Sequence, residues 1–216
     1  MLCNEKSAVI VCGADIGNYE FVLSRISMDS YFIYCDSGLK HHEKLNRTPD
    51  LIIGDFDSYE EALAEKFNKE TIKLPVMKDD TDSVYAVKEA IRRGFTSIII
   101  IGAVGNRLDH TLGNIYSLIY CYENYINASI IDDYSEMKII GNRCFEEITD
   151  KYPYFSIVAI SGVAKGVCIE NAKYPLYNAE IKPDYQYGIS NEVIKGKIAR
   201  VSVSEGFLLL IKVKKC

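Results

Sequence analysis

The chain has 216 residues, of which 48% are hydrophobic and 25% are charged, a balance typical of soluble globular proteins. The formal net charge is -5 and the chain has no long basic run. Nucleic-acid binding requires clustered lysines and arginines, so we expect no nucleic-acid partner. No apolar stretch reaches the roughly 18 residues that a membrane-spanning helix needs, so we expect no membrane partner either.

The first part of the chain, from residue 7 to about 132, alternates apolar runs with helix-like segments. The apolar runs are continuous, as in strands buried on both faces of a sheet, and lie at residues 7–13, 31–38, 50–58, 71–76, 97–105 and 128–133. Three-to-four helical spacing occurs at residues 18–26, 39–46, 58–67, 81–94 and 109–125. This alternation predicts an α/β domain over residues 1–132, with a mostly parallel, doubly wound sheet and helices on both faces.

The helix expected at residues 81–94 has the clearest pattern. Val84, Val87, Ala90 and Ile91 fall on one side of it, and Gly94 provides a C-terminal stop. Thr81 is suited to be the N-cap of this helix, and Asp82 places a favourable charge in its first turn. These structural roles are compatible with a role in ligand binding.

From about residue 136 the pattern changes to short strands separated by turn signals, with no helical pattern of useful length. Strands are expected at residues 136–141, 155–161, 166–172, 178–182, 197–204 and 206–215. The segment RVSVSEGFLLLIKV, residues 200–213, resembles a closing β-hairpin. We therefore predict a small all-β sandwich domain over residues 133–216.

The seven cysteines are odd in number, form no CxxC pair and in several cases end apolar runs. This pattern favours buried hydrophobic residues in a reducing cytoplasm over disulfides or a zinc site. The N-terminal residues have no basic lead and only a short apolar run, so we expect no signal peptide.

Polar residues follow nearly every strand expected in the first domain. They are Gly13, Ala14 and Asp15 after the first strand, Asp36, Ser37 and Gly38 after the second, Asp55, Asp57 and Ser58 after the third, Lys78, Asp79, Asp80, Thr81 and Asp82 after the fourth, and Asn106, Arg107, Asp109 and His110 after the fifth. Because open parallel sheets bind ligands at the carboxyl ends of their strands, these clusters predict one functional rim.

The rim has the chemistry of a metal and phosphate site. Several carboxylates repel one another unless a cation joins them, and Asp55 and Asp57 can point to the same side of an extended segment and reach one ion. Oxygen ligands favour Mg²⁺ over zinc, and Mg²⁺ held by few carboxylates leaves positions open for substrate phosphates. Lys78 and Arg107 could neutralise those phosphates, whereas His110 could equally be an ordinary helix-start residue. The P-loop motif GxxxxGK[ST] is absent.

Four segments, taken together and in order, resemble the thiamine pyrophosphokinase family. They are DSGLKHHEKLNRTPDLIIGDFDS from residue 36, LPVMKDDTDSVYAVKEAI from residue 74, IGAVGNRLDHTLGNI from residue 101 and GISNE from residue 188. The family more often has D-G-G where this chain has Asp36-Ser37-Gly38. We expect this departure to cost little if Ser37 does not need a positive φ.

The resemblance implies that the pyrophosphoryl group of ATP is transferred to the hydroxyl of thiamine, with release of AMP, by a homodimer with active sites at its interface. It assigns Mg²⁺ to Asp55, Asp57 and Asp82, and further catalytic roles to Arg107 and Asp109. It places Asp36, Lys78, Asp79, Thr81 and His110 near ATP, and Ser190 and Asn191 near thiamine. On the residues alone, Ser190 and Asn191 would be read as an ordinary polar turn. Either Asp82 or Asp109 could accept the hydroxyl proton.

Two other functions fit parts of the pattern. A DxD pair after an apolar strand also marks haloacid-dehalogenase-like phosphatases, but here the pair follows the third strand rather than the first, and Arg107 and His110 would have no role. A non-catalytic sensor of thiamine or a nucleotide would not need so many carboxylates. One assay distinguishes the three functions. The kinase forms AMP from ATP and thiamine, the phosphatase releases phosphate from a phosphoester, and the sensor gives neither product.

Overall fold

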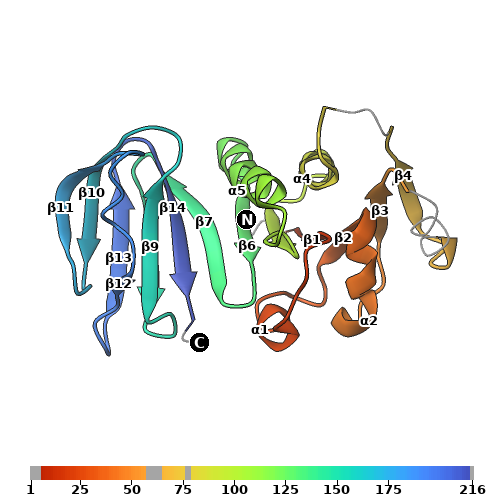
Figure 1. The fold of residues 1–216 in the computed structure, drawn as a ribbon, viewed down its shortest axis with the longest axis horizontal. Helices are drawn as coiled ribbons and strands as arrows, with labels where there is room; N and C mark the ends of the chain where they lie inside the picture. Colours follow the sequence, from red (N-terminus) through yellow and green to blue (C-terminus); the bar gives the residue numbers. More distant parts are fainter. Residues whose placement is uncertain (1–5, 57–64, 76–78, 215–216) are drawn as a thin grey trace, which may run out of the picture. The chain divides into compact units, whose positions relative to one another are not determined.

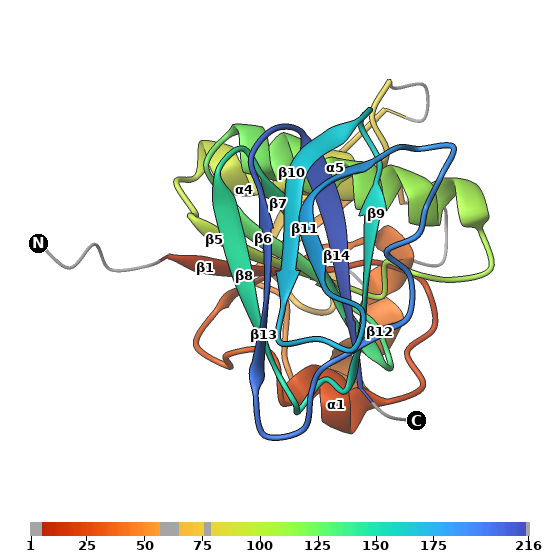
Figure 2. The ribbon, with the colours of Figure 1, turned by 90° about the vertical axis from the view of Figure 1, so that its left-hand side faces the viewer.

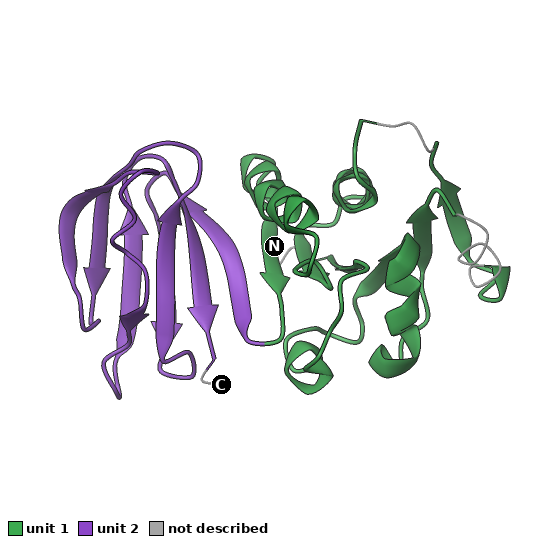
Figure 3. Ribbon diagram, in the orientation of Figure 1, with its two compact units in different colours: residues 1–133 green, residues 134–216 purple. Residues whose placement is uncertain are grey.

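The computed structural model describes residues 6–56, 65–75 and 79–214. The chain forms two compact units, residues 1–133 and 134–216 (Figure 3). Asp57, Ser58 and Lys78 lie outside the described residues, as does most of the helix expected at residues 58–67. In the part of the chain that is described, no helix has the length and apolarity needed to cross a membrane.

The first unit contains a parallel sheet whose order is β6-β5-β1-β2-β3-β4. Its strands are β1 (Ser7–Val11), β2 (Tyr31–Cys35), β3 (Leu51–Gly54), β4 (Glu70–Lys73), β5 (Ser97–Ile101) and β6 (Asn127–Ile131). The chain starts in the middle of the sheet, extends it to one side as far as β4, and then returns to the other side of β1 with β5. The strand order therefore reverses between β1 and β5, which is where such sheets bind their ligands.

Helices cover both faces of this sheet, as the sequence predicts. They are α1 (Tyr19–Leu23), α2 (His42–Leu45), α4 (Asp82–Arg92) and α5 (Leu108–Glu123), with a 3₁₀ helix η1 (Asp36–His41) between β2 and α2. Figures 1 and 2 show α1 and α2 on one face and α4 and α5 on the other. In α4, Thr81 is the N-cap and accepts a hydrogen bond from the Val84 N–H, and Gly94 follows the last turn with a φ of 80°.

β1, β2 and β3 are buried along almost their whole length, but the edge strand β4 is not. Every residue of β3 is buried, and in β1 and β2 only the first residue is partly exposed. The expectation that all the apolar runs are buried on both faces is wrong for β4, which is mostly exposed. Its position explains this, because β4 pairs only with β3 and ends the described sheet.

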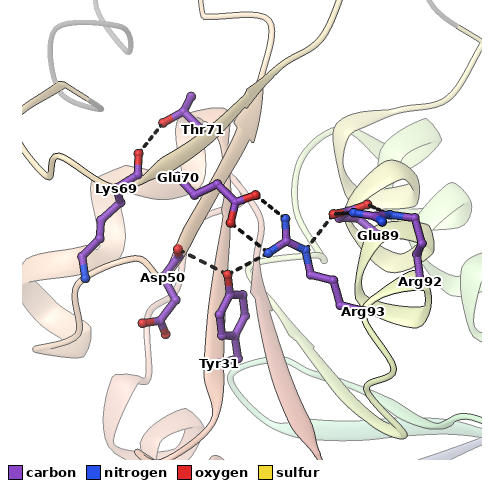
Figure 4. A network of polar contacts seen from close by, with 8 residues as sticks. All are labelled: Tyr31, Asp50, Lys69, Glu70, Thr71, Glu89, Arg92 and Arg93. Carbon is purple, nitrogen blue, oxygen red and sulfur yellow. Dashed lines mark hydrogen bonds and ion pairs between the residues drawn. The ribbon is translucent and has the colours of Figure 1, made fainter.

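A charged network joins the C-terminal end of α4 to the starts of β4 and β2 (Figure 4). The Arg93 guanidinium donates to both carboxylate oxygens of Glu70, at 2.5 and 2.9 Å, to Glu89 at 2.7 Å and to the Tyr31 hydroxyl at 3.1 Å. Glu89 is only 5% exposed and also accepts two hydrogen bonds from Arg92. The network therefore holds the exposed edge strand to α4 at the amino ends of the strands.

The second unit is built from two antiparallel sheets, with no helix in residues 134–214. One sheet, ordered β12-β9-β14-β7, contains β7 (Ser135–Gly141), β9 (Tyr154–Ala159), β12 (Asn191–Glu192) and β14 (Phe207–Val213). The other, ordered β11-β10-β13-β8, contains β8 (Cys144–Thr149), β10 (Ala164–Glu170), β11 (Leu176–Ile181) and β13 (Ile198–Val203). Burial alternates along β9 and β13, as expected for sheets with one inward face, and the predicted sandwich is confirmed.

The hairpin expected at residues 200–213 is wrong. β13 pairs with β8 and β10, whereas β14 pairs with β7 and β9, so residues 204–206 carry the chain from one sheet to the other. Sequence reasoning also missed β8, because Ile148 is the only fully buried residue in that strand and leaves no apolar run to detect.

Candidate functional site

A cavity of about 400 Å³ opens at the carboxyl ends of β1, β2 and β5. The register brings these ends together, since Val11 of β1 pairs with Tyr34 of β2 and with Ile101 of β5. The rim residues that line the cavity are Gly13, Ala14, Asp15, Asp36, Ser37, Thr81, Asp82, Asn106, Arg107 and His110. The cavity therefore collects polar side chains from four of the five predicted clusters.

The turn after β2 packs so closely that neither Gly38, within it, nor Gly54, at the end of the neighbouring strand β3, could carry a side chain. A Cβ on Gly38 would lie 2.2 Å from the carbonyl oxygen of Val11, and one on Gly54 would lie 2.7 Å from a carboxylate oxygen of Asp36. Asp36 itself has a φ of 34°, a left-handed conformation that non-glycine residues rarely adopt and that is often found at functional sites. Ser37 has no positive φ, so the departure from D-G-G is accommodated.

Asp82 reaches the cavity from the first turn of α4. Next to it, the Ser83 hydroxyl donates to Asn114 Oδ1 at 2.7 Å, and the Asn114 amide donates to the carbonyl oxygen of Ala103 at 2.8 Å. Both hydrogen-bonded side chains line the cavity, and Asn114 is buried. Together they tie the start of α4 and the second turn of α5 to the loop after β5. Sequence reasoning missed them, because each reads as an ordinary helix residue.

Arg107 and Asp109 form a two-pronged ion pair at the start of α5. Arg107 Nε donates to Asp109 Oδ1 at 3.0 Å and Nη2 donates to Oδ2 at 2.7 Å. These hydrogen bonds hold the pKa of the Asp109 carboxyl well below its usual range and raise that of Arg107. Asp109 is therefore a weak base that orients Arg107, and Arg107 lines the cavity whereas Asp109 does not.

The cavity contains a cation that sequence reasoning missed. Lys40 lies one turn after Asp36 in η1 and donates to Asp15 Oδ1 at 2.7 Å. Both residues are exposed, so this ion pair adds little to stability and can open for a ligand. In the sequence, Lys40 is marked only by its position four residues after Asp36. This spacing is too common to identify a binding residue.

The remaining predicted residues are not gathered in the cavity. Asp55 and Asp79 are described but do not line it, and Asp80 forms an exposed ion pair with Lys88 at 2.6 Å. Asp57 and Lys78 lie outside the described residues. Within the described ranges, no group of three or more His, Cys, Asp or Glu side chains is close enough to hold a metal ion by itself.

The late predicted pair, Ser190 and Asn191, lies in the second unit. Ser190 is exposed, has a φ of 59° and donates its N–H to Ser156 Oγ at 3.0 Å. Asn191 is 3% exposed; its side chain accepts from the Tyr174 N–H at 3.1 Å and donates to the Tyr174 carbonyl at 2.8 Å. Asn191 thus fastens the segment before β11 to β12, and Ser190 is the exposed member of the pair.

Comparison with known proteins identifies the family. Residues 22–130 match the family model of the thiamin pyrophosphokinase catalytic domain, and residues 144–208 match that of the thiamin pyrophosphokinase vitamin B1 binding domain. The chain belongs to the thiamine pyrophosphokinase family. A curated relative, the thiamine pyrophosphokinase of Bacillus subtilis, is 31% identical over 164 residues, which are 74% of this chain and 76% of the relative.

Solved thiamine pyrophosphokinase structures share the whole fold. The Bacillus subtilis structure has a TM-score of 0.87 at 26% identity and covers 98% of this chain and 100% of its own. The Geobacillus thermodenitrificans structure has a TM-score of 0.82 at 26% identity, with coverage of 97% and 98%. Thiamine pyrophosphokinases are enzymes that use ATP and thiamine and generally need a divalent metal. The predicted enzyme class is therefore confirmed, and the phosphatase and sensor alternatives are not favoured.

Proposed function

We propose that this chain transfers the pyrophosphoryl group of ATP to the hydroxyl of thiamine, giving thiamine diphosphate and AMP, and that the cavity at the strand ends is the site of transfer. The observation that carries this proposal is the meeting of Asp36, Asp82, Lys40 and Arg107 in one cavity. Cations there suit the phosphates of ATP, and carboxylates suit a metal ion and the permanent positive charge of thiamine. The domain over residues 1–132 then binds ATP and metal, and that over residues 133–216 contributes to thiamine binding.

The oxygen donors of the cavity fit Mg²⁺. This ion is usually held by one or two carboxylates and completed by water and substrate phosphates, so the carboxylates of Asp36 and Asp82 are sufficient donors from the described residues. We propose Asp55, Asp57 and Asp82 as ligands, with Asp36 beside the ion or the phosphates. When bound, Mg²⁺ supplies Lewis-acid polarisation of the phosphate oxygens.

The chain's own residues position and neutralise the reacting groups. Arg107, held in orientation by Asp109, would stabilise the negative charge that develops on the transferred group and on departing AMP. Lys78, Asp79, Thr81 and His110 are proposed around the phosphates as well, and Lys40 joins them. Asp82 and Asp109 are the two candidates to take the thiamine hydroxyl proton, and the hydrogen bonds from Arg107, which lower the pKa of Asp109, weaken it in that role.

A product assay tests this function. With ATP labelled at the β-phosphate, the label should appear in thiamine diphosphate, and AMP should form in equal amount. Release of inorganic phosphate from phosphoesters with no need for thiamine would favour the phosphatase. Binding of thiamine or ATP without any product would favour the sensor.

Asn191 gives a test of the thiamine end of the site. Asn191→Ala should raise the KM for thiamine while the KM for ATP changes little, because the Tyr174 backbone loses its two side-chain hydrogen bonds and the Ser190 segment is released. Steady-state kinetics with each substrate varied in turn checks this. An unchanged thiamine KM in a folded variant would mean that the segment is only a polar turn.

We further propose that the chain forms a homodimer and that α5 takes part in the contact. Leu108, Leu112, Tyr116 and Tyr120 are exposed and recur every four residues along one face of α5, an apolar strip that is uncommon on monomers. The strip begins one residue after Arg107, so a partner seated on it would reach the rim of the cavity. The described cysteines form no disulfide with one another, which suits the reducing cytoplasm as the place where the enzyme works.

The double variant Leu112→Glu/Tyr116→Glu should dissociate this dimer, because it places two charges in the apolar contact. Sedimentation equilibrium should then give the mass of one chain, 24.4 kDa, in place of twice that mass. Tyr125→Glu is the control, since Tyr125 lies beyond the end of α5 and is 96% exposed. A double variant that stays dimeric would exclude α5 from the contact.

A further inference from the structure

His41, at the end of η1, is a buried imidazole that the proposed mechanism does not use. It is 2% exposed, and both of its ring nitrogens have partners. Nε2 lies 2.9 Å from the carbonyl oxygen of Ala14, and Nδ1 lies 2.6 Å from the hydroxyl oxygen of Tyr19. The ring therefore joins η1 to the loop after β1 and to α1.

The partners determine which nitrogen carries the proton. A carbonyl oxygen can only accept, so Nε2 must donate to Ala14, and in the neutral ring Nδ1 accepts from the Tyr19 hydroxyl. Burial lowers the pKa of His41, which keeps the ring neutral at physiological pH. Both hydrogen bonds then act in one fixed direction, and the Ala14 carbonyl has a constant donor.

Ala14 is held from its other side as well. Its N–H donates to the carbonyl oxygen of Gly102 at 2.8 Å, in the loop after β5. The loop of Gly13, Ala14 and Asp15 is thus fixed between the exits of β5 and β2, at the point where the strand order reverses. All three of its residues line the cavity, where a ligand phosphate is expected.

We propose that His41 is a positioning residue for ATP: its hydrogen bond to the Ala14 carbonyl holds the loop of Gly13 to Asp15 in the conformation that receives the phosphates. The inference rests on the proposed function, in which this cavity binds ATP. His41 itself does not touch the cavity, so its effect passes through Ala14. The thiamine-binding segment around Ser190 lies in the other unit and should not respond.

Three variants test this proposal: His41→Leu, His41→Gln and, as a matched control, His42→Leu. Leucine removes the donor to Ala14, whereas the glutamine side-chain amide can replace it. Among the described hydrogen bonds, the His42 side chain bonds only to the Leu39 carbonyl of its own segment, and His42 does not line the cavity. The KM values for ATP and thiamine are measured for each variant, together with the affinity for α,β-methylene-ATP by calorimetry.

His41→Leu should raise the KM for ATP and weaken analogue binding about tenfold, the ratio that corresponds to the loss of one buried hydrogen bond of about 1.4 kcal/mol. His41→Gln should recover most of this loss, and the thiamine KM should stay within about twofold in all three variants. An unchanged ATP affinity in folded His41→Leu, a loss that glutamine does not recover, or an equal loss for thiamine would each overturn the proposal. Failure of the wild-type enzyme to form AMP would instead refute the proposed function, and the calorimetry distinguishes the two cases.

Discussion

Replacing Asp82 by asparagine should lower the turnover of ATP and thiamine by about a hundredfold or more, the effect of losing one preorganised electrostatic contact at a reacting group. The variant keeps the size of the side chain and removes only its charge. Folding should be preserved, because Thr81 rather than Asp82 caps α4. Turnover and thermal unfolding measured on the same preparation check both expectations.

Asp80→Asn is the matched control for this prediction. Asp80 lies two residues away, does not line the cavity and pairs with Lys88 at the surface, so its loss should change turnover less than twofold. Asp55→Asn and Asp57→Asn should behave like Asp82→Asn if these residues are metal ligands, and excess Mg²⁺ or Mn²⁺ should recover part of the activity. Normal turnover in Asp82→Asn, or a covalent phosphoryl group on Asp55, would contradict the proposed roles.

Replacing Glu89 by glutamine should destabilise the first unit by about 1.5 kcal/mol, because it removes the negative charge from the hydrogen bonds with Arg92 and Arg93, whereas Arg93 keeps its ion pair with Glu70. For a chain of this length, that loss corresponds to a fall in Tm of roughly 3 to 6 °C. Glu43→Gln is the control, since its carboxylate is exposed and, within the described part of the chain, its only ion pair is a long one of 3.9 Å with His42. A Tm within about 1 °C of the wild type would show that Glu89 does not stabilise the network of Figure 4.

The contacts of Glu89 with Arg92 and Arg93 also predict that the free energy of unfolding depends on pH. The hydrogen bonds from Arg92 and Arg93 lower the pKa of Glu89 from 4.5 to about 2 in the folded protein. A depressed folded pKa stabilises the protein fully above pH 4.5, and this contribution is lost as the pH falls toward 2. The free energy of unfolding of the wild type should therefore fall more steeply than that of Glu89→Gln across this window. Parallel profiles would contradict the assignment.

The first unit could be predicted well because its sheet is buried on both faces. Residues 7–11, 31–35 and 51–54 form continuous apolar runs, and the parallel arrangement alone gathers the polar residues that follow them at one edge. β4 departed from this rule because an edge strand can be exposed while still pairing. In the second unit, local sequence cannot specify which sheet a strand joins, and so the expected hairpin at residues 200–213 was wrong.

The details of the site depend on contacts that sequence spacing does not encode. Asn114 reaches the Ala103 carbonyl across 11 residues, and His41 reaches Ala14 across 27. Asp109 belongs to a predicted cluster, yet it turns to Arg107 instead of the cavity. These contacts depend on the direction in which turns and helix starts point their side chains. That direction is known only from the folded structure.

A crystal structure with thiamine, Mg²⁺ and α,β-methylene-ATP tests the central claim most directly, because this analogue replaces the bond that pyrophosphoryl transfer would break. The account predicts that the β-phosphate lies in the cavity at the ends of β1, β2 and β5, with Arg107 on its oxygens and Asp82 on the metal beside it. A nucleotide bound elsewhere, with the β-phosphate out of reach of both residues, would contradict it.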